Sequence, residues 1–304
     1  MSTFVKFLCG LATLTISSVL YAADTGATNS KISFIPSANA AMTPAVRPEL
    51  RLPVPTGETL VFSAPPRESA GEAAQIYEPV AQYFSRVLGR KVEYRHPKSW
   101  LSYQSDAAKG HYDIVFNEPH FNSWNVARLN HATLAKISDE SVFVVVTRSD
   151  DYRLTTMKQL AGKKVCSIGS SNLGTLALLA EFDAMRQPLV IENANWAKVY
   201  EGLTEGRCTA ATLPVAILKK FDRSSATRVI HRSAAMPNQV FSASPRLTQD
   251  EQAKLTQALI SADGKRVLTA LLAANGAEKG LALASKEEYA GMDSYLKDVW
   301  GYGR

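Results

Sequence analysis

A run in the middle of the chain, Gly169-Ser-Ser-Asn-Leu-Gly174-Thr175, has the residue types of an anion-binding turn. It follows a predicted strand and begins a predicted helix, so the N–H groups of residues 172–175 start that helix without intrahelical partners. The helix dipole favours negative charge there, and the hydroxyl groups of Ser170, Ser171 and Thr175 add donors. We therefore take Ser170, Ser171, Asn172, Gly174 and Thr175 as candidate ligand contacts. The alternative is that Ser-Ser-Asn only caps the helix.

The same run resembles a phosphate-binding loop, but Thr175 stands where that loop has its lysine. This removes the argument for phosphoryl transfer. The sequence contains no His-Glu-x-x-His, Cys-x-x-Cys, Gly-x-Ser-x-Gly or Gly-x-Gly-x-x-Gly motif, and its five histidines have no metal-ligand spacing. We expect no catalytic residues, no metal and no cofactor, and we expect that the protein is not an enzyme.

A second polar group, Asn117-Glu118-Pro119-His120, follows another predicted strand. Glu118 could accept a hydrogen bond from an amine or hydroxyl of a ligand, and His120 could donate one to an anion. The alternative is that both residues cap the next helix and face solvent, because acids are favoured at helix starts. Asn195 follows a further strand and is another candidate contact. Arg67 is either an anion partner or an ordinary surface arginine.

Strands and helices must alternate to place these groups, and the pattern of apolar residues predicts that they do. The predicted strands are 59–63, 91–95, 112–117, 132–137, 141–147, 163–168, 189–192, 209–213, 228–231 and 239–243. The predicted helices are 72–88, 99–109, 119–129, 156–160, 173–185, 195–205, 214–221, 248–260, 264–274 and 286–300. This order is typical of an α/β protein with doubly wound, mainly parallel sheets, whose ligands lie at the carboxyl ends of the strands.

The chain has 304 residues, which suits two domains of ordinary size. We predict two lobes with a ligand cleft between them. Lobe one comprises 58–140 and 241–304, lobe two comprises 150–228, and 141–149 and 229–240 are the crossing or hinge segments.

Hydrophobic residues make up 46% and the net charge is +6, with scattered basic residues. This composition is that of a globular protein and gives no support to nucleic-acid binding.

The N-terminus has the pattern of a secretory signal. Lys6 precedes an apolar stretch over 7–20, and small residues follow at Ala22 and Ala23. We expect a signal peptide over 1–22, cleaved near Ala22 or Ala23, a flexible leader over 23–57, and a periplasmic protein; an uncleaved anchor is the alternative. Disulfides persist in that compartment. Cys166 and Cys208 either form one or remain two buried thiols.

Several motifs together resemble those of a known family. In order along the chain they are Tyr77-Glu-Pro79 with Leu88-Gly89-Arg-Lys-Val92, Gly110-His-Tyr-Asp113-Ile-Val-Phe-Asn-Glu-Pro119, Leu160-Ala-Gly162-Lys-Lys-Val165 with Ser171-Asn-Leu-Gly174, and Gly202-Leu-Thr-Glu-Gly206 with Ala210-Ala-Thr-Leu-Pro214. With these motifs, the span 59–259 resembles the periplasmic solute-binding proteins of phosphate, phosphite and phosphonate importers. These form the PhnD-like branch of the type II periplasmic binding proteins.

The resemblance implies an oxyanion held at a helix start by a Ser-Thr-Ser run, which falls here on Ser171, Asn172 and Leu173. Only the first serine is kept. The acid with which the family grips the amino group of an aminophosphonate would fall within 213–216, where this chain has no acid. By position, Tyr77 and Trp100 are aromatic cleft walls, although such residues equally suit a core.

We therefore expect a monomeric solute-binding protein that presents a small phosphate-like or phosphonate-like anion to the permease and ATPase of an ABC importer. A second hypothesis is a ligand-binding periplasmic sensor subunit that regulates a membrane signalling partner. A third, an exported enzyme on the same fold, lacks a nucleophile–base pair.

Overall fold

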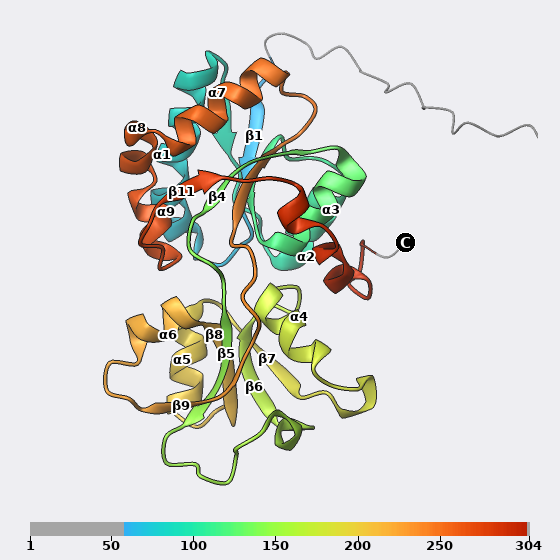
Figure 1. Cartoon of the computed structure of the whole chain (residues 1–304), viewed down its shortest axis with the longest axis vertical. Coiled ribbons are helices and arrows are strands. Elements are labelled where there is room, and N and C mark those ends of the chain that lie inside the picture. Colours follow the sequence, from blue (N-terminus) through green and yellow to red (C-terminus); the bar gives the residue numbers. More distant parts are fainter. Residues whose placement is uncertain (1–57, 303–304) are drawn as a thin grey trace, which may run out of the picture. The chain divides into compact units, whose positions relative to one another are not determined.

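The computed structural model describes residues 58–302, which lie in one compact unit, Leu52–Arg304. Two β-sheets, each with flanking helices, form two lobes, so the predicted two-lobed α/β fold is confirmed (Figure 1). The first sheet has the strand order β11-β4-β10-β3-β1-β2. Its strands are β1 (Leu60–Ser63), β2 (Val92–Tyr94), β3 (Ile114–Asn117), β4 (Ala132–Ile137), β10 (Val240–Ala243) and β11 (Leu281–Leu283). The predicted signal peptide and leader lie outside the described residues.

The second sheet has the order β7-β6-β8-β5-β9. Its strands are β5 (Phe143–Arg148), β6 (Lys164–Ile168), β7 (Leu189–Asn193), β8 (Ala210–Pro214) and β9 (Thr227–Arg232). In each sheet the strands that are joined by helices run parallel: β1 pairs in parallel with β2 and β3, and β6 with β7 and β8. The strands β10 and β5 are antiparallel to their neighbours. The sheets are therefore mixed rather than mainly parallel, because strands that come from the other lobe enter each sheet in the opposite direction.

The helices cover the sheets and connect the strands. They are α1 (Ala70–Leu88), α2 (Trp100–Ala108), α3 (Pro119–Leu129), α4 (Leu173–Ala180), α5 (Trp196–Thr204), α6 (Val215–Phe221), α7 (Gln249–Ile260), α8 (Ala262–Val267) and α9 (Thr269–Ala274). The described residues also form the short 3₁₀ helices η1 (Met157–Leu160), η2 (Ala184–Arg186), η3 (Glu287–Tyr289) and η4 (Met292–Leu296). Within 58–302, none of the helices combines the length and the apolar character that crossing a bilayer requires.

The chain passes between the two sheets twice, through 138–142 and through 233–239. The two passages pair with each other, since the backbone N–H of Ser141 donates to the carbonyl of Met236 at 2.9 Å and the reverse bond is 3.0 Å. The predicted crossing segments 141–149 and 229–240 overlap these passages, but most of the first is β5 and the start of the second is β9. The apolar, β-branched run of β5 is buried in the sheet rather than left between the lobes.

Each lobe has its own apolar core. Aromatic rings of Phe62, Phe84 and Phe241 meet in the core of the first lobe, with centroids 5.4 to 6.1 Å apart. Val144, Cys166, Leu203, Leu213 and others fill the core of the second lobe. The segment 292–302 after β11 packs against α3 and α4, so it contacts both lobes. It forms short 3₁₀ turns where the apolar pattern predicted a helix over 286–300.

A disulfide joins Cys166 in β6 to Cys208 in the turn before β8, with the two Cα atoms 5.6 Å apart. The strands β6 and β8 are parallel neighbours. Cys166 pairs across the sheet with Ala211, and Cys208 lies just before β8 begins. The bridge therefore links the start of one strand to the middle of its neighbour in the core of lobe two.

We expect the double variant Cys166→Ser, Cys208→Ser to unfold with a free energy about 4 kcal/mol lower than that of the oxidised protein. The bridge closes a loop with a sequence separation of 42 residues, and removing it returns that loop entropy to the unfolded chain. Urea unfolding followed by circular dichroism measures the difference. Wild-type protein under reductant is the matched control and should show a similar loss. Equal stability of the oxidised protein and the double variant would contradict the prediction.

Candidate functional site

The side chain of Glu118 lies at the contact between the two lobes. Glu118 is the N-cap residue of α3, but its carboxylate does not cap that helix. It accepts hydrogen bonds instead from the first turn of α4 in the other lobe, from Asn172 Nδ2 at 2.5 Å and from the backbone N–H of Leu173 at 2.8 Å. The side chain is 3% exposed. A carboxylate supplied by lobe one therefore occupies the positive end of a lobe-two helix.

Through this contact, Glu118 occupies part of the predicted anion-binding turn. We expected the N–H groups of residues 172–175 to be available to a ligand. The structure shows that Asn172 N–H donates to the carbonyl of Gly169 at 3.1 Å, Leu173 N–H donates to Glu118, and Gly174 N–H donates to Asn172 Oδ1 at 3.0 Å. The chain's own oxygen atoms satisfy these donors. The sequence does not reveal this, because the carboxylate that reaches the helix lies 55 residues away in the chain.

Arg67 lies beside Glu118 and is 2% exposed. It comes from the loop between β1 and α1, and its Nη1 atom is 3.7 Å from Glu118 Oε1. Its guanidinium group also lies over the ring of Phe116, 5.7 Å from the centroid. None of its three side-chain nitrogens has a hydrogen-bond partner among residues 58–302. A buried guanidinium with five unused N–H groups is costly unless something accepts from them.

Three more buried polar atoms near this pair have no hydrogen-bond partner within the described part of the chain: Asn117 Nδ2, Ser171 Oγ and His120 Nδ1. Asn117 lies at the end of β3, and its Oδ1 accepts from the hydroxyl of Tyr103. Ser171 belongs to the turn before α4. Native proteins leave few buried polar atoms unsatisfied, so a group of them at one place indicates a ligand or solvent partner.

His120 is buried and donates to its own chain rather than to a ligand. Its Nε2 is 2.9 Å from the carbonyl oxygen of Ser171, an atom that can only accept. Burial lowers the pKa of His120 to about 3, against which the Ser171 hydrogen bond acts. The ring is therefore neutral near pH 7, with its proton on Nε2. Its other nitrogen, Nδ1, is an acceptor, so we correct the expectation that His120 donates to an anion.

The two acids beside Arg67 have altered proton affinities. Burial raises the pKa of Glu118, and the positive charge of Arg67 opposes this rise most strongly. Burial likewise raises the pKa of Glu68, again opposed chiefly by Arg67. Burial alone would lower the pKa of Arg67. The negative charges of its neighbours outweigh this effect, so the pKa of Arg67 is raised above its ordinary value. The arginine is therefore cationic, while both acids take up a proton more readily than exposed glutamates.

The remaining predicted residues are dispersed. Thr175 uses its hydroxyl within lobe two, with Ser167 Oγ at 2.6 Å and the Gly169 carbonyl at 3.0 Å. The side chain of Asn195 caps α5 by accepting from Lys198 N–H at 3.0 Å. Tyr77 lies in the lobe-one core, although its hydroxyl is 3.5 Å from Glu68. Tyr77 thus fits the alternative of a core residue, and the polar side chains of Thr175 and Asn195 make their hydrogen bonds within lobe two.

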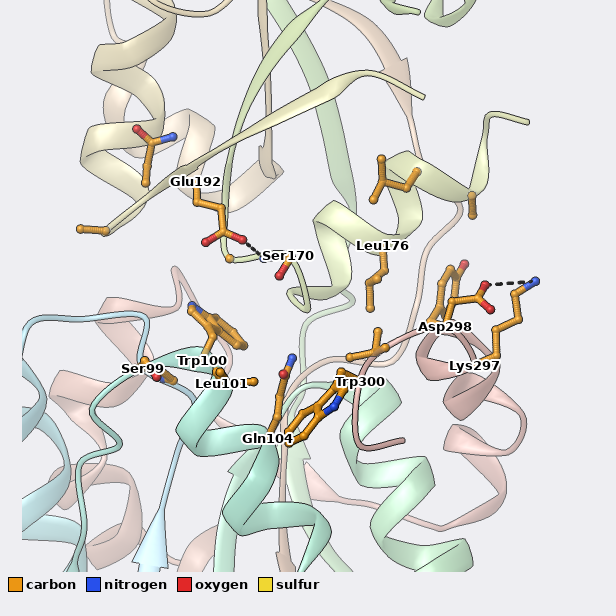
Figure 2. A pocket seen from close by; sticks show the side chains of 18 of the residues that line it. Ser99, Trp100, Leu101, Gln104, Ser170, Leu176, Glu192, Lys297, Asp298 and Trp300 are labelled. Atoms are coloured by element: carbon orange, nitrogen blue, oxygen red, sulfur yellow. Dashed lines mark hydrogen bonds and ion pairs between the residues drawn. The ribbon is translucent and has the colours of Figure 1, made fainter. Parts of the chain in front are cut away.

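Trp100 lies directly against the turn before α4. A Cβ atom added to Gly169 would be 2.5 Å from Trp100 Cδ1, so the indole requires a glycine at this position. Trp100 and the exposed Ser170 line an open cleft of about 1280 Å³ together with Gln104 and Trp300 (Figure 2). In Figure 2, Ser170 N–H donates to the carboxylate of Glu192, at 2.8 Å.

A second cleft, of about 550 Å³, reaches Glu118. Its lining includes Glu118 and Leu173 and parts of both crossing passages, such as Ser141 and Asn238. Within residues 58–302, no cluster of three or more histidine, cysteine, aspartate or glutamate side chains could hold a metal ion.

A family model described as the periplasmic substrate-binding protein of phosphonate ABC transporters matches residues 62–289. The chain belongs to this family. The match includes Arg67, Glu118 and the turn before α4. The predicted resemblance to the periplasmic solute-binding proteins of phosphonate importers is thereby confirmed.

Individual relatives agree with this assignment. The phosphate-import protein PhnD of Mycolicibacterium smegmatis is 27% identical over 120 residues. That match covers 36% of this chain and 37% of the relative, so the chain spans just over a third of that protein's length. The structure of PhnD1 from Prochlorococcus marinus in complex with methylphosphonate matches with a TM-score of 0.66 and 12% identity, over 79% of this chain and 98% of that one. A binding component of a phosphonate transporter from Pseudomonas aeruginosa matches with a TM-score of 0.60 and 13% identity, over 77% and 83%.

Sequence reasoning underestimated Arg67 and did not consider Glu68. The available signal was the position of both residues directly after β1, at the carboxyl end of a strand that the type II fold directs toward the cleft. A surface arginine and a buried one look alike in a single sequence. The packing of α1 and α3 around the loop between β1 and α1 is what buries Arg67.

The buried neutral His120 predicts a pH-dependent stability. Its folded pKa is lowered, so below pH ~6.5 the unfolded chain binds a proton that the folded chain does not. As the pH falls from ~6.5 to about 3, the free energy of unfolding therefore decreases by about 1.4 kcal/mol for each pH unit. Urea unfolding at several pH values should show a shallower loss for His120→Gln. The exposed His111 provides the control, and a His111→Gln protein that changes the slope equally would refute this explanation.

Proposed function

We propose that the protein binds a small oxyanion, phosphate or a phosphonate-like solute, between its two lobes and delivers it to an ABC importer. The observation that carries the proposal is the buried Arg67 at the contact between the lobes, with its guanidinium lacking hydrogen-bond partners within residues 58–302. A guanidinium presents a planar fork of donors that matches two oxygens of one oxyanion. Membership of the phosphonate-transporter family supports the same class of solute.

Donors from both lobes surround this position. Asn117 Nδ2 comes from lobe one and Ser171 Oγ comes from lobe two, and neither has a hydrogen-bond partner within residues 58–302. A solute held by both sets would bridge the lobes and favour a closed arrangement. The crossing passages 138–142 and 233–239 are the places about which the lobes would move, which is the hinge motion typical of two-lobed binding proteins.

The finer assignments are part of the same proposal. The mature protein is a periplasmic monomer that begins after a signal peptide over 1–22, and its closed form is presented to a permease and ATPase in the inner membrane. A transport role is favoured over a sensor role because the matching family is defined by ABC transporters. The solute is not an aminophosphonate gripped in lobe two, since 213–216 contains no acid.

A thermal-shift screen tests the proposal. Phosphate, methylphosphonate, phosphite, methanesulfonate and an amino acid are each added to purified mature protein. A solute present at ~100 times its dissociation constant stabilises the folded state by about 2.7 kcal/mol, which raises the melting temperature by roughly 5 °C or more for a protein of this size. A phosphorus oxyanion should give this rise and the amino acid should not. If the melting temperature stays constant with every oxyanion, the proposal is wrong.

Replacing Arg67 tests the residue that carries the proposal. Arg67→Gln removes the charge and the fork and should weaken binding of the oxyanion found in the screen by about 10- to 100-fold. Arg67→Lys keeps the charge and should lose less. Isothermal calorimetry measures the affinity, and circular dichroism shows that each variant is folded. Arg153→Gln is the control, since that side chain is 89% exposed. Equal affinities of Arg67→Gln and Arg153→Gln would contradict a binding role for Arg67.

A further inference from the structure

The carboxylate of Glu118 already holds the two donors that an oxyanion would need at the start of α4. Leu173 N–H and Asn172 Nδ2 both point at its oxygens, at 2.8 and 2.5 Å. A solute that binds there displaces this carboxylate from the helix or lies directly against it. In either case two negatively charged groups meet in a region where Glu118 and its partners are buried.

The charges of the site do not balance when an anion is added. Arg67 is the cation that faces Glu118, and Glu68 is a second acid beside Arg67. One positive charge already faces two acids, and a solute brings at least one more negative charge. Like charges in close contact away from water repel strongly, and such sites respond by keeping one acid protonated.

We propose that the site takes up its oxyanion together with one proton, which is carried by Glu118. This inference rests on the proposed function and specifies the chemistry of the same site. A proton from solvent forms a new O–H bond on the Glu118 carboxylate. The neutral acid then becomes a hydrogen-bond donor to a solute oxygen and releases Leu173 N–H and Asn172 Nδ2 for the solute. No covalent bond within the protein breaks, and a singly charged anion plus a proton leaves the charge of the site unchanged.

Glu118 is better placed for this proton than Glu68. Glu118 lies between Arg67 and the start of α4, so both lobes contact it. Glu68 is half-buried, lines the open cleft on the lobe-one side and accepts from Tyr77 at 3.5 Å. A proton on Glu118 therefore frees helix donors, whereas a proton on Glu68 frees none of them.

The other groups around Glu118 do not compete for the proton. The closest titratable side chain on α3 is His120, whose Nε2 is 3.8 Å away and donates to Ser171. Tyr103 on α2 is buried, and burial raises its pKa above the usual tyrosine value. The facing residues of α4 are Asn172 and Leu173, which carry no charge. The cleft that reaches Glu118 is also lined by the charged residues Asp139, Glu140, Lys219, Lys220, Arg232 and Glu278. The raised pKa of Glu118, caused by burial, agrees with its role as proton acceptor.

Calorimetry with methylphosphonate as the probe tests the inference. Titrations at pH 8 in two buffers with different ionisation enthalpies count the protons taken up on binding. Wild-type protein should take up about one proton more than Glu118→Gln, whose amide donates without a proton. The wild-type affinity should rise about tenfold more per unit fall in pH than that of the variant. The comparison between proteins cancels the proton that the probe itself can gain.

Glu68→Gln is the matched control and should keep the wild-type proton count. Equal counts for wild type and Glu118→Gln would overturn the inference, and so would loss of the extra proton in Glu68→Gln alone. If Glu118→Gln does not fold, infrared difference spectra of the wild type decide the matter: a new protonated-carboxyl band on binding is expected, and its absence refutes the inference. If neither phosphate nor methylphosphonate binds to the wild type, the proposed function fails instead.

Discussion

A single buried cation, Arg67, sets the character of the place where the two lobes meet. Its guanidinium group lies 3.7 Å from Glu118 and beside Glu68, with little access to solvent. Taking a charge out of water is unfavourable unless opposite charge and hydrogen bonds replace the water. The two acids supply the charge, but none of the guanidinium nitrogens makes a hydrogen bond within residues 58–302. A group that accepts several hydrogen bonds at once would therefore be stabilised at this position.

The fold brings these groups together through the ends of strands. Arg67 follows β1, Asn117 and Glu118 follow β3, and Ser171 and Asn172 follow β6. Each of these strands has a hydrogen-bonded neighbour on both sides, so the loops after them start from fixed positions in the sheet. The lobes then need only two short passages between them to place the loops face to face. The disulfide and the apolar cores serve the same purpose by keeping each sheet rigid.

Much of this arrangement can be predicted from sequence, since it depends on local patterns. The strand Ala132–Ile137 and the helix Pro119–Leu129 have the bounds that alternation and the helix-start proline predict. The strand β11 has only three residues and lies beside β4 at the edge of its sheet, so its local pattern is too weak to predict it. The site is harder, because its defining contact joins Glu118 to Leu173 across two lobes. Propensity and spacing show which residues start a helix, but they do not show which distant side chain will fill its first turn.

The disulfide between Cys166 and Cys208 bears on the export of the newly synthesised chain. Thiols remain reduced in the cytoplasm and become oxidised in the periplasm, where the members of this family work. A newly made copy therefore has a lobe two that is easier to unfold while it waits to be exported. Passage through a translocation pore requires an extended chain, and the missing bridge helps to keep it so. Oxidation in the periplasm then links β6 to the turn before β8 through the disulfide. The cross-linked chain can no longer become fully extended, so it does not pass back through the pore.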